Sequence, residues 1–324
     1  MARAIDVRGL TKTYTLRSGD TIEAVRGVDL HVDEGEILAF LGSNGAGKTT
    51  TIEILEGFRD RTGGDVTVLG QDPATAPLSW REDIGVVLQE SEPSPELTVE
   101  EVMTQYASYY RAPRSIDEIL ELVGLADHRM QRNKVLSGGQ KRRLDLALAL
   151  IGDPKLVFLD EPTTGFDPSA RRDAWGMIER LRELGTTVLL TTHYMDEAEQ
   201  LSDRIVVISG GRIIAEGTAD ALADQVQLKT RVSWDPGEVP VSAVPDVLRS
   251  DLEEGDDVVR IETDDVTAIV HALSSWAADN GSALRSLGVV RPNLEDTFLR
   301  LTDTDEADDR GNQPDSSSST GGGE

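Results

Sequence analysis

The sequence predicts an α/β domain with a largely parallel sheet, an antiparallel β part and a helical subdomain, followed by a small α+β domain and a disordered tail. Short apolar runs alternate with helical patterns from Ile5 to about Ala223, which is typical of an α/β fold. The alternation then restarts and ends in a polar, low-complexity stretch. We therefore expect domains at 1–224 and 225–302 and a disordered acidic tail at 303–324.

Three runs are almost continuously apolar and predict the centre of the parallel sheet. They occupy residues 36–41, 155–159 and 187–191. Strands that are covered on both faces have this composition, because neither face meets water. Residues 203–217 predict a hairpin, since a Gly-Gly pair separates two apolar runs there.

Two further patterns predict parts that flank this sheet. Residues 5–10, 21–32 and 65–69 form strand-like runs with looser alternation, so we expect an antiparallel β part beside the main sheet. Between 97 and 130 the apolar residues recur with helical spacing, which predicts an inserted helical subdomain.

The pattern of the second domain alternates strands with helices. Val226, Leu228, Val232 and Trp234 are expected on one face of a strand, and residues 258–261 predict another. A helix is expected from 266, because apolar residues recur with helical spacing as far as Trp276. Asn280-Gly281 then offers a stop. A strand at 284–290 and a helix capped by Asn293 complete the predicted domain.

The composition excludes several functions. Asp+Glu number 59 against Lys+Arg 32, so the net charge is −27 at pH 7. Such a field repels nucleic acid and anionic lipid, and no nucleic-acid partner is expected. With no cysteine, the chain can form no disulfide or thiolate metal site, which fits a cytosolic address. No stretch approaches the roughly 18 apolar residues that span a bilayer, so we expect any membrane passage to belong to another polypeptide.

The strongest motif is a phosphate-binding loop. Residues 42–49 read GSNGAGKT, which satisfies G-x-x-x-x-G-K-[ST], and they follow a buried strand and precede a helical run. Glycines let backbone N–H groups converge on phosphate oxygens, and the helix N-terminus adds its positive end. The alternative is a glycine-rich turn with an incidental lysine. The predicted nucleotide contacts are Gly42, Ser43, Asn44, Gly45, Ala46, Gly47, Lys48, Thr49 and Thr50.

Two carboxylates end another buried strand. Asp160 and Glu161 close the run KLVFLDE, at the carboxyl end where open parallel sheets bind ligands. One acid can hold Mg²⁺ through water, and the next can orient or deprotonate the attacking water. Taken alone, an Asp-Glu pair is more often a solvated strand end. Together with the upstream loop it predicts Asp160 and Thr49 as metal ligands and Glu161 as the catalytic base.

A second anion site opens a helix at LSGGQ. Ser137, Gly138, Gly139 and Gln140 supply a hydroxyl and free backbone N–H groups at a helix start. By itself this is an ordinary helix cap. Because only the first anion site has a lysine and a metal ligand, the two sites suggest halves of a composite pocket. The other histidines, His31, His128 and His271, lack metal-site spacing and are interpreted as structural.

With these motifs in order, the chain resembles the nucleotide-binding subunits of ABC transporters from about residue 2 to 223. The resemblance implies ATP and Mg²⁺ as cofactors and a homodimer in which the signature completes the partner's pocket. Ser137 and Gly139 would then contact the γ-phosphate held by the other copy. Four further positions match the family's pattern, namely Tyr14 (adenine stacking), Gln89 (metal and attacking water), Asp167 (D-loop acid) and His193 (switch histidine at the γ-phosphate).

The stretch after His193 and the ending NLEDTFLRLT are similar to ATPase subunits of daunorubicin-type drug exporters. This resemblance implies a separate integral-membrane permease, export of a lipophilic compound or lipid, and a location on the cytoplasmic face of the membrane. An importer ATPase subunit and a soluble non-transport ABC ATPase are the alternatives. A soluble ABC ATPase that acts on DNA or ribosomes would be expected to contain a long coiled-coil insert or a tandem cassette, and neither fits in 324 acidic residues.

Overall fold

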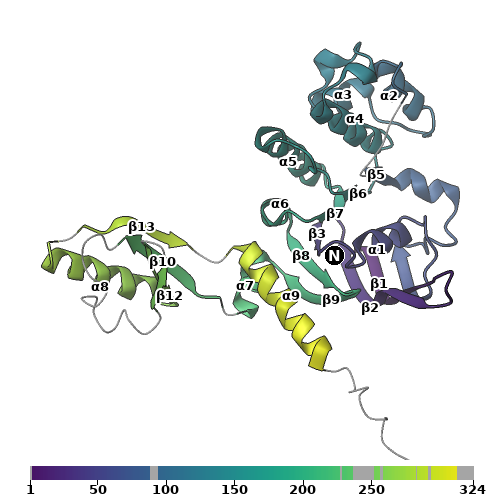
Figure 1. The fold of residues 1–324 in the computed structure, drawn as a ribbon. Helices are drawn as coiled ribbons and strands as arrows, with labels where there is room; N and C mark the ends of the chain where they lie inside the picture. The colour runs from purple at the N-terminus through teal and green to yellow at the C-terminus, as the bar shows by residue number, and fades with distance from the viewer. Residues whose placement is uncertain are drawn as a thin grey trace, which may run out of the picture. The chain divides into compact units, whose positions relative to one another are not determined.

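A computed structural model describes residues 2–87, 94–226, 228–235, 252–255, 258–281, 283–290 and 293–311 (Figure 1). The chain divides into two compact units, Met1–Ala219 with Asp305–Glu324, and Asp220–Thr304. This division lies close to the expected boundary at 224/225, and the role of an accessory domain stays a prediction. Among the described residues, no helix combines the length and apolarity needed to cross a membrane.

The main sheet of the first unit has six strands in the order β5-β6-β7-β3-β8-β9. All neighbours pair in parallel except β8 and β9, which form the predicted hairpin. Every residue of β3 is buried, as the apolar run predicts. The parallel sheet is thus confirmed, and its bounds are β3 Ile37–Leu41, β5 Ile84–Val87, β6 Leu156–Asp160, β7 Thr187–Thr192, β8 Arg204–Ser209 and β9 Arg212–Gly217.

The predicted antiparallel β part is also present. Strand β1 (Arg3–Thr15) pairs with β2 (Thr21–Asp33) on one side and β4 (Gly63–Val68) on the other. Its inward side chains share one hydrophobic core with β3 and helix α1 (Lys48–Leu55). The core therefore ties the phosphate loop, which lies between β3 and α1, to both sheets.

The helical subdomain gathers around α4 (Gly138–Leu150), which contacts both α2 (Val99–Ala107) and α3 (Ile116–Leu122) (Figure 1). Helix α2 begins with a capping box, in which Thr98 accepts a bond from the Glu101 N–H. Two short 3₁₀ turns, η2 Ala126–His128 and η3 Asn133–Val135, lie between α3 and α4, and a third, η1 Leu78–Asp83, comes directly before β5.

Two helices follow strands of the main sheet. Helix α5 (Pro168–Glu183) comes after β6, and α6 (Met195–Leu201) comes after β7. The two helices contact each other, and each packs on the sheet. Helix α7 (Ala219–Gln225) then begins where the second unit starts, with Leu222 fully buried.

The second unit is a four-stranded antiparallel sheet in the order β11-β12-β10-β13. Helix α8 (Val266–Asp279) packs on it over a core that includes Trp234 and Trp276. Val226 and Leu228 were expected in the first strand but precede it, because the chain is still leaving α7 there. The strands are β10 Thr230–Asp235, β11 Leu252–Gly255, β12 Val258–Thr263 and β13 Arg285–Val290.

The last helix, α9 (Leu294–Gly311), begins at the predicted cap. The Asn293 Oδ1 accepts a bond of 2.8 Å from the Asp296 N–H. The helix continues past residue 302, which corrects the expected start of the disordered tail. Once a helix is nucleated, each added residue gains one backbone hydrogen bond, so even an acidic stretch can extend it. Residues 312–324 of the expected tail lie outside the described part of the chain.

Candidate functional site

The phosphate loop has a backbone that requires glycine. Gly45 and Gly47 have φ angles of +82° and +107°, in the left-handed region. A Cβ atom on Gly47 would lie 2.5 Å from the carbonyl oxygen of Ala24, and one on Gly42 would lie 2.5 Å from that of Ile208. The loop is therefore fixed in shape by neighbouring backbone, and it delivers the chain into the N-terminus of α1.

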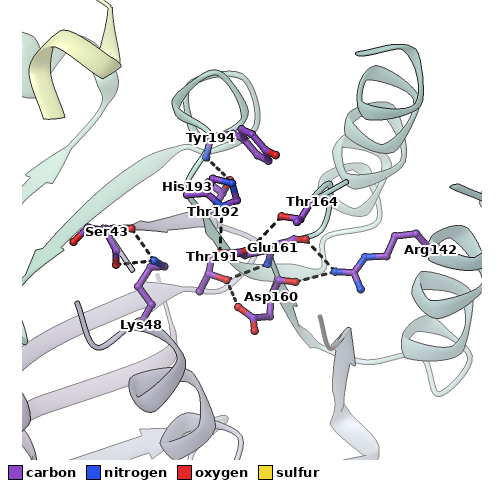
Figure 2. Close-up of polar contacts among 11 residues, drawn as sticks. Ser43, Lys48, Arg142, Asp160, Glu161, Thr164, Thr191, Thr192, His193 and Tyr194 are labelled. Atoms are coloured by element: carbon purple, nitrogen blue, oxygen red, sulfur yellow. Dashed lines mark hydrogen bonds and ion pairs between the residues drawn. The ribbon is translucent and has the colours of Figure 1, made fainter. Parts of the chain in front are cut away.

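Lys48 is the buried cation of this loop. Its side chain is 7% exposed, and its Nζ donates to the carbonyl oxygens of Gly42 (2.7 Å) and Ser43 (3.1 Å) (Figure 2). Burial lowers the pKa of the ammonium, while the charges of Glu161 and Asp160 raise it. A buried cation held by neutral carbonyls is well suited to bind the anionic groups of a ligand.

A cleft of about 400 Å³ collects residues from distant parts of the sequence. It brings the loop and the start of α1 together with one residue each from the ends of β6 and β7. Three loop residues predicted by sequence, Gly42, Ser43 and Ala46, are not among the residues that line it. The cleft is lined by Ala24, Asn44, Gly45, Gly47, Lys48, Thr49, Thr50, Glu161 and His193.

Glu161 is held in an uncommon backbone conformation at the end of β6. Its φ is +46°, which few residues other than glycine adopt. Its N–H donates to the backbone and hydroxyl oxygens of Thr191, both at 3.1 Å. Its side chain is 15% exposed, accepts from the Thr164 hydroxyl at 3.1 Å and lies 3.2 Å from Nδ1 of His193. These contacts hold the carboxylate of Glu161, which lines the cleft, in place (Figure 2).

Asp160 has its own partners beside this turn. One carboxylate oxygen accepts a short hydrogen bond from the Thr191 hydroxyl. The adjacent backbone is held by Arg142 of α4, which donates to the carbonyl oxygens of Asp160 (2.8 Å), Glu161 (3.2 Å) and Pro162 (3.1 Å). Sequence analysis missed Thr191 and Arg142. The run Lys-Arg-Arg is typical of a solvated basic face, and no local signal marks one of its arginines as partly buried.

The signature residues lie outside the cleft of their own chain. Ser137 caps α4, accepting from the Gln140 N–H at 3.3 Å, and Gln140 returns a bond to the Ser137 N–H at 2.9 Å. Ser137 and Gly138 are exposed, and a Cβ on Gly138 would meet no atom within 4 Å. The helix start is thus preformed and open to a ligand or another chain.

Tyr14 lies over the start of α1. Its hydroxyl is 3.3 Å from Oγ1 of Thr50, and the cationic groups of Lys12 and Arg59 lie 5.2 and 5.4 Å from its ring centre. Asp167 instead caps α5, where it accepts from two backbone N–H groups that lower its pKa. Gln89 falls outside the described residues.

The oxygen donors of Thr49 and Asp160 fit a magnesium ion whose remaining ligands are phosphate oxygens and water. Thr49 lines the cleft, and Asp160 lies near enough to raise the pKa of Lys48. Among the described residues, no group of three or more His, Asp or Glu side chains could hold a metal by itself. Mg²⁺ is usually bound by one or two protein oxygens together with substrate phosphates, so a hydroxyl and a carboxylate suffice.

Comparisons with known sequences agree with this geometry. The family described as ABC transporter matches residues 25–164, and the family described as ABC transporter domain-containing protein-like, C-terminal domain, matches 230–293. The daunorubicin/doxorubicin resistance ATP-binding protein DrrA of Streptomyces peucetius is 44% identical and covers 68% of this chain and 67% of its own. DrrA3 of Streptomyces coeruleorubidus, a daunorubicin resistance ATP-binding protein, is 36% identical over 93% of this chain and 96% of its own. The Nod factor export ATP-binding protein I of Rhizobium johnstonii is 40% identical over 92% and 94%.

Solved structures give the same result. The ATP-binding cassette MJ0796, in a dimeric post-hydrolysis state bound to ADP and Pi, is 27% identical with a TM-score of 0.59, covering 66% of this chain and 98% of its own. The ADP conformation of the cassette MJ1267 is 25% identical with a TM-score of 0.59, covering 70% and 95%. With relatives of 36–44% identity over two thirds or more of its length, the chain belongs to the ABC transporter family as an ATP-hydrolysing subunit.

Proposed function

We propose that this chain powers an exporter, and that two copies of it share each ATP between them. The observation that carries the proposal is the separation of the two anion sites. Lys48, Glu161 and His193 meet in one cleft, whereas the open signature at Ser137 does not line it. A second copy in the opposite orientation would place its signature over this cleft, and one solved relative is a dimeric cassette.

Export is favoured by the relatives rather than by the cleft itself. Proteins named for daunorubicin resistance and for Nod factor export match more than nine tenths of this chain, including the second unit. We infer that the substrate is a lipophilic compound or lipid, that it passes through a permease on a separate chain, and that this subunit works on the cytoplasmic face of the membrane.

The chemistry follows from the carboxylate at the end of β6. Glu161 would accept a proton from the water that attacks the γ-phosphorus, while the bond from that phosphorus to the ADP oxygen breaks. His193 contacts Glu161 at 3.2 Å and would orient it toward the γ-phosphate. Lys48 and the loop N–H groups would bind the phosphates. Thr49 and Asp160, together with Gln89, would hold Mg²⁺, which supplies positive charge to the phosphate oxygens.

Mixed dimers test the sharing. One chain carries Ser137→Arg and its partner carries Lys48→Ala, and two different affinity tags select the hybrid. If pockets are shared, the first chain's loop and the second chain's signature form one intact pocket. We expect single-turnover ATP hydrolysis well above that of either homodimeric variant.

The matched control places both substitutions on one chain beside a wild-type partner. With shared pockets each cleft then lacks one half, and hydrolysis should be lost. If each chain completes its own pocket, the outcome is reversed, because the wild-type partner stays active and the first hybrid is silent. That reversal would exclude the shared dimer.

A further inference from the structure

Arg142 joins the two anion sites within one chain. It lies in the second turn of α4, the helix that Ser137 caps, and its guanidinium reaches the end of β6. There it donates to three consecutive carbonyl oxygens, those of Asp160, Glu161 and Pro162, at 2.8 to 3.2 Å. Figure 2 shows the contacts with Asp160 and Glu161. A planar guanidinium with several donors suits this contact, whereas a lysine ammonium cannot match its fork.

The contact is partly buried and electrostatically supported. Burial lowers the pKa of the guanidinium, and the carboxylates of Asp145, Asp160 and Glu197 raise it. Hydrogen bonds to a charged group in such surroundings are stronger than bonds to water-exposed groups. Arg142 therefore fixes the position of this turn relative to α4.

The turn needs such support because Glu161 is in the left-handed region. A non-glycine residue there costs on the order of 1–3 kcal/mol and persists only where its surroundings hold it. Thr191 holds the Glu161 N–H from β7, and Arg142 holds the carbonyl oxygens from α4. A shift of α4 would thus move the backbone that aims the catalytic carboxylate.

If pockets are shared, the two ends of this link serve different ATP molecules. The α4 start of one chain contacts the nucleotide bound by the partner, and Glu161 acts on the nucleotide of its own chain. We propose that Arg142 is a positioning residue that couples the two pockets, so that nucleotide engaged at the signature sets the orientation of Glu161 in the other pocket. This inference rests on the proposed dimer.

A double-mutant cycle on one chain of a mixed dimer tests the coupling. The partner chain carries Glu161→Gln, so that only the first chain's cleft hydrolyses ATP, and that cleft receives its signature from the partner. The first chain carries Ser137→Ala, Arg142→Gln or both. Single-turnover hydrolysis and ATP affinity are measured in the full-length hybrid.

We expect Arg142→Gln to slow ATP hydrolysis in the first chain's cleft by on the order of 10- to 100-fold, the scale of a misplaced catalytic group. ATP affinity should change little. Ser137→Ala, although remote from the hydrolysing cleft, should slow it several-fold. The double variant should be no slower than Arg142→Gln alone, because both changes break one link. Arg142→Lys should recover thermal stability without recovering the rate.

Two controls separate coupling from general damage. Thr98→Ala removes the equivalent capping box from α2, and Lys141→Gln removes a charge from the exposed neighbour of Arg142. Neither should change the rate. The coupling would be overturned if the rate loss in the double variant equalled the product of the losses in Ser137→Ala and Arg142→Gln. A normal hydrolysis rate in Arg142→Gln would overturn it as well. Loss of complementation in the Ser137→Arg and Lys48→Ala hybrid would instead overturn the shared dimer.

Discussion

The two units use their sheets differently. In the first unit, the central strand β3 is buried along its whole length, so only the strand ends are open to chemistry. In the second unit, β10 turns Val232 and Trp234 toward α8 and leaves Arg231 exposed, where it pairs with Glu262 at 3.4 Å. In a sheet that is covered on both faces, functional residues gather where the strands end. Among the described residues of the second unit, the sheet that is covered on one face has no comparable cluster of functional residues.

This difference separates activity from stability. Changes at the carboxyl ends of β6 and β7 should affect turnover and leave the second unit intact. Changes in the core of the second unit should affect its stability and leave the ATP cleft intact, because every described residue that lines the cleft belongs to the first unit.

The largest expected effect comes from Glu161→Gln. The amide keeps the shape of the side chain but cannot accept a proton from water. We expect ATP binding to remain and turnover to fall by roughly 10² or more, the usual scale of a positioned base. Steady-state hydrolysis and binding of a fluorescent ATP analogue measure the two quantities.

The same variant tests the direction of transport. If the proposed export through a separate permease holds, wild type should drive ATP-dependent uptake of a lipophilic drug into inside-out vesicles that contain that permease, and Glu161→Gln should lose this uptake together with hydrolysis. A conservative change nearby, Thr164→Ser, retains the hydroxyl that donates to Glu161 and should stay active. Near-normal hydrolysis by Glu161→Gln would remove this carboxylate from the mechanism.

The second unit should respond to Trp234→Ala. Trp234 is fully buried in that unit's core, and large-to-small changes of buried aromatics cost about 3 to 5 kcal/mol. Hydrogen exchange should accelerate at the amides of β10 and β12 and stay slow in β3 and β6. ATP affinity should be unchanged.

Trp234→Phe is the matched comparison. The indole N–H has no hydrogen-bond partner among the described residues, so its removal costs no bond there. A much smaller loss of protection is expected than for Trp234→Ala. If Trp234→Ala abolished ATP binding, the two units would not be energetically separable.

Sequence reasoning succeeds where chemistry needs fixed residue types in consecutive positions. The loop around Lys48 and the pair Asp160-Glu161 are of this kind. Lys48 and Glu161 line the cleft because the buried strands β3 and β6 end beside it. Arg142 and Thr191 could not be found this way, since their partners lie far along the chain and only the tertiary fold brings them together. The left-handed φ of Glu161 has no sequence signature either.

The fold follows the same rule. Long apolar runs predict β3, β6 and β7 closely, because burial on both faces dictates their composition. Strand β5 has only four residues, too few to show a period, so the sequence pattern does not predict it. Val226 and Leu228 have strand-like spacing, but they lie in the connection between the end of α7 at Gln225 and the start of β10 at Thr230.

The most specific effect concerns Glu56, a carboxyl of the first unit that is 6% exposed. Burial, with the nearby charges of Asp160 and Glu53, raises its pKa from 4.5 to about 8. The folded state therefore keeps a proton that the unfolded state releases, and stability falls as pH rises from 4.5 to 8. Over pH 5 to 7.5 this amounts to roughly 3 kcal/mol.

Glu56→Gln should remove this dependence, because the amide does not titrate. Denaturant unfolding at pH 5 and pH 7.5 measures the change in unfolding free energy for wild type and variant. Glu118→Gln controls for the loss of one negative charge from a chain of net charge −27. The Glu118 side chain is 65% exposed, and its carboxylate lies 4.0 Å from Arg114, too far for a hydrogen bond. If Glu56→Gln lost as much stability between the two pH values as wild type, the buried carboxyl would not be the group that titrates.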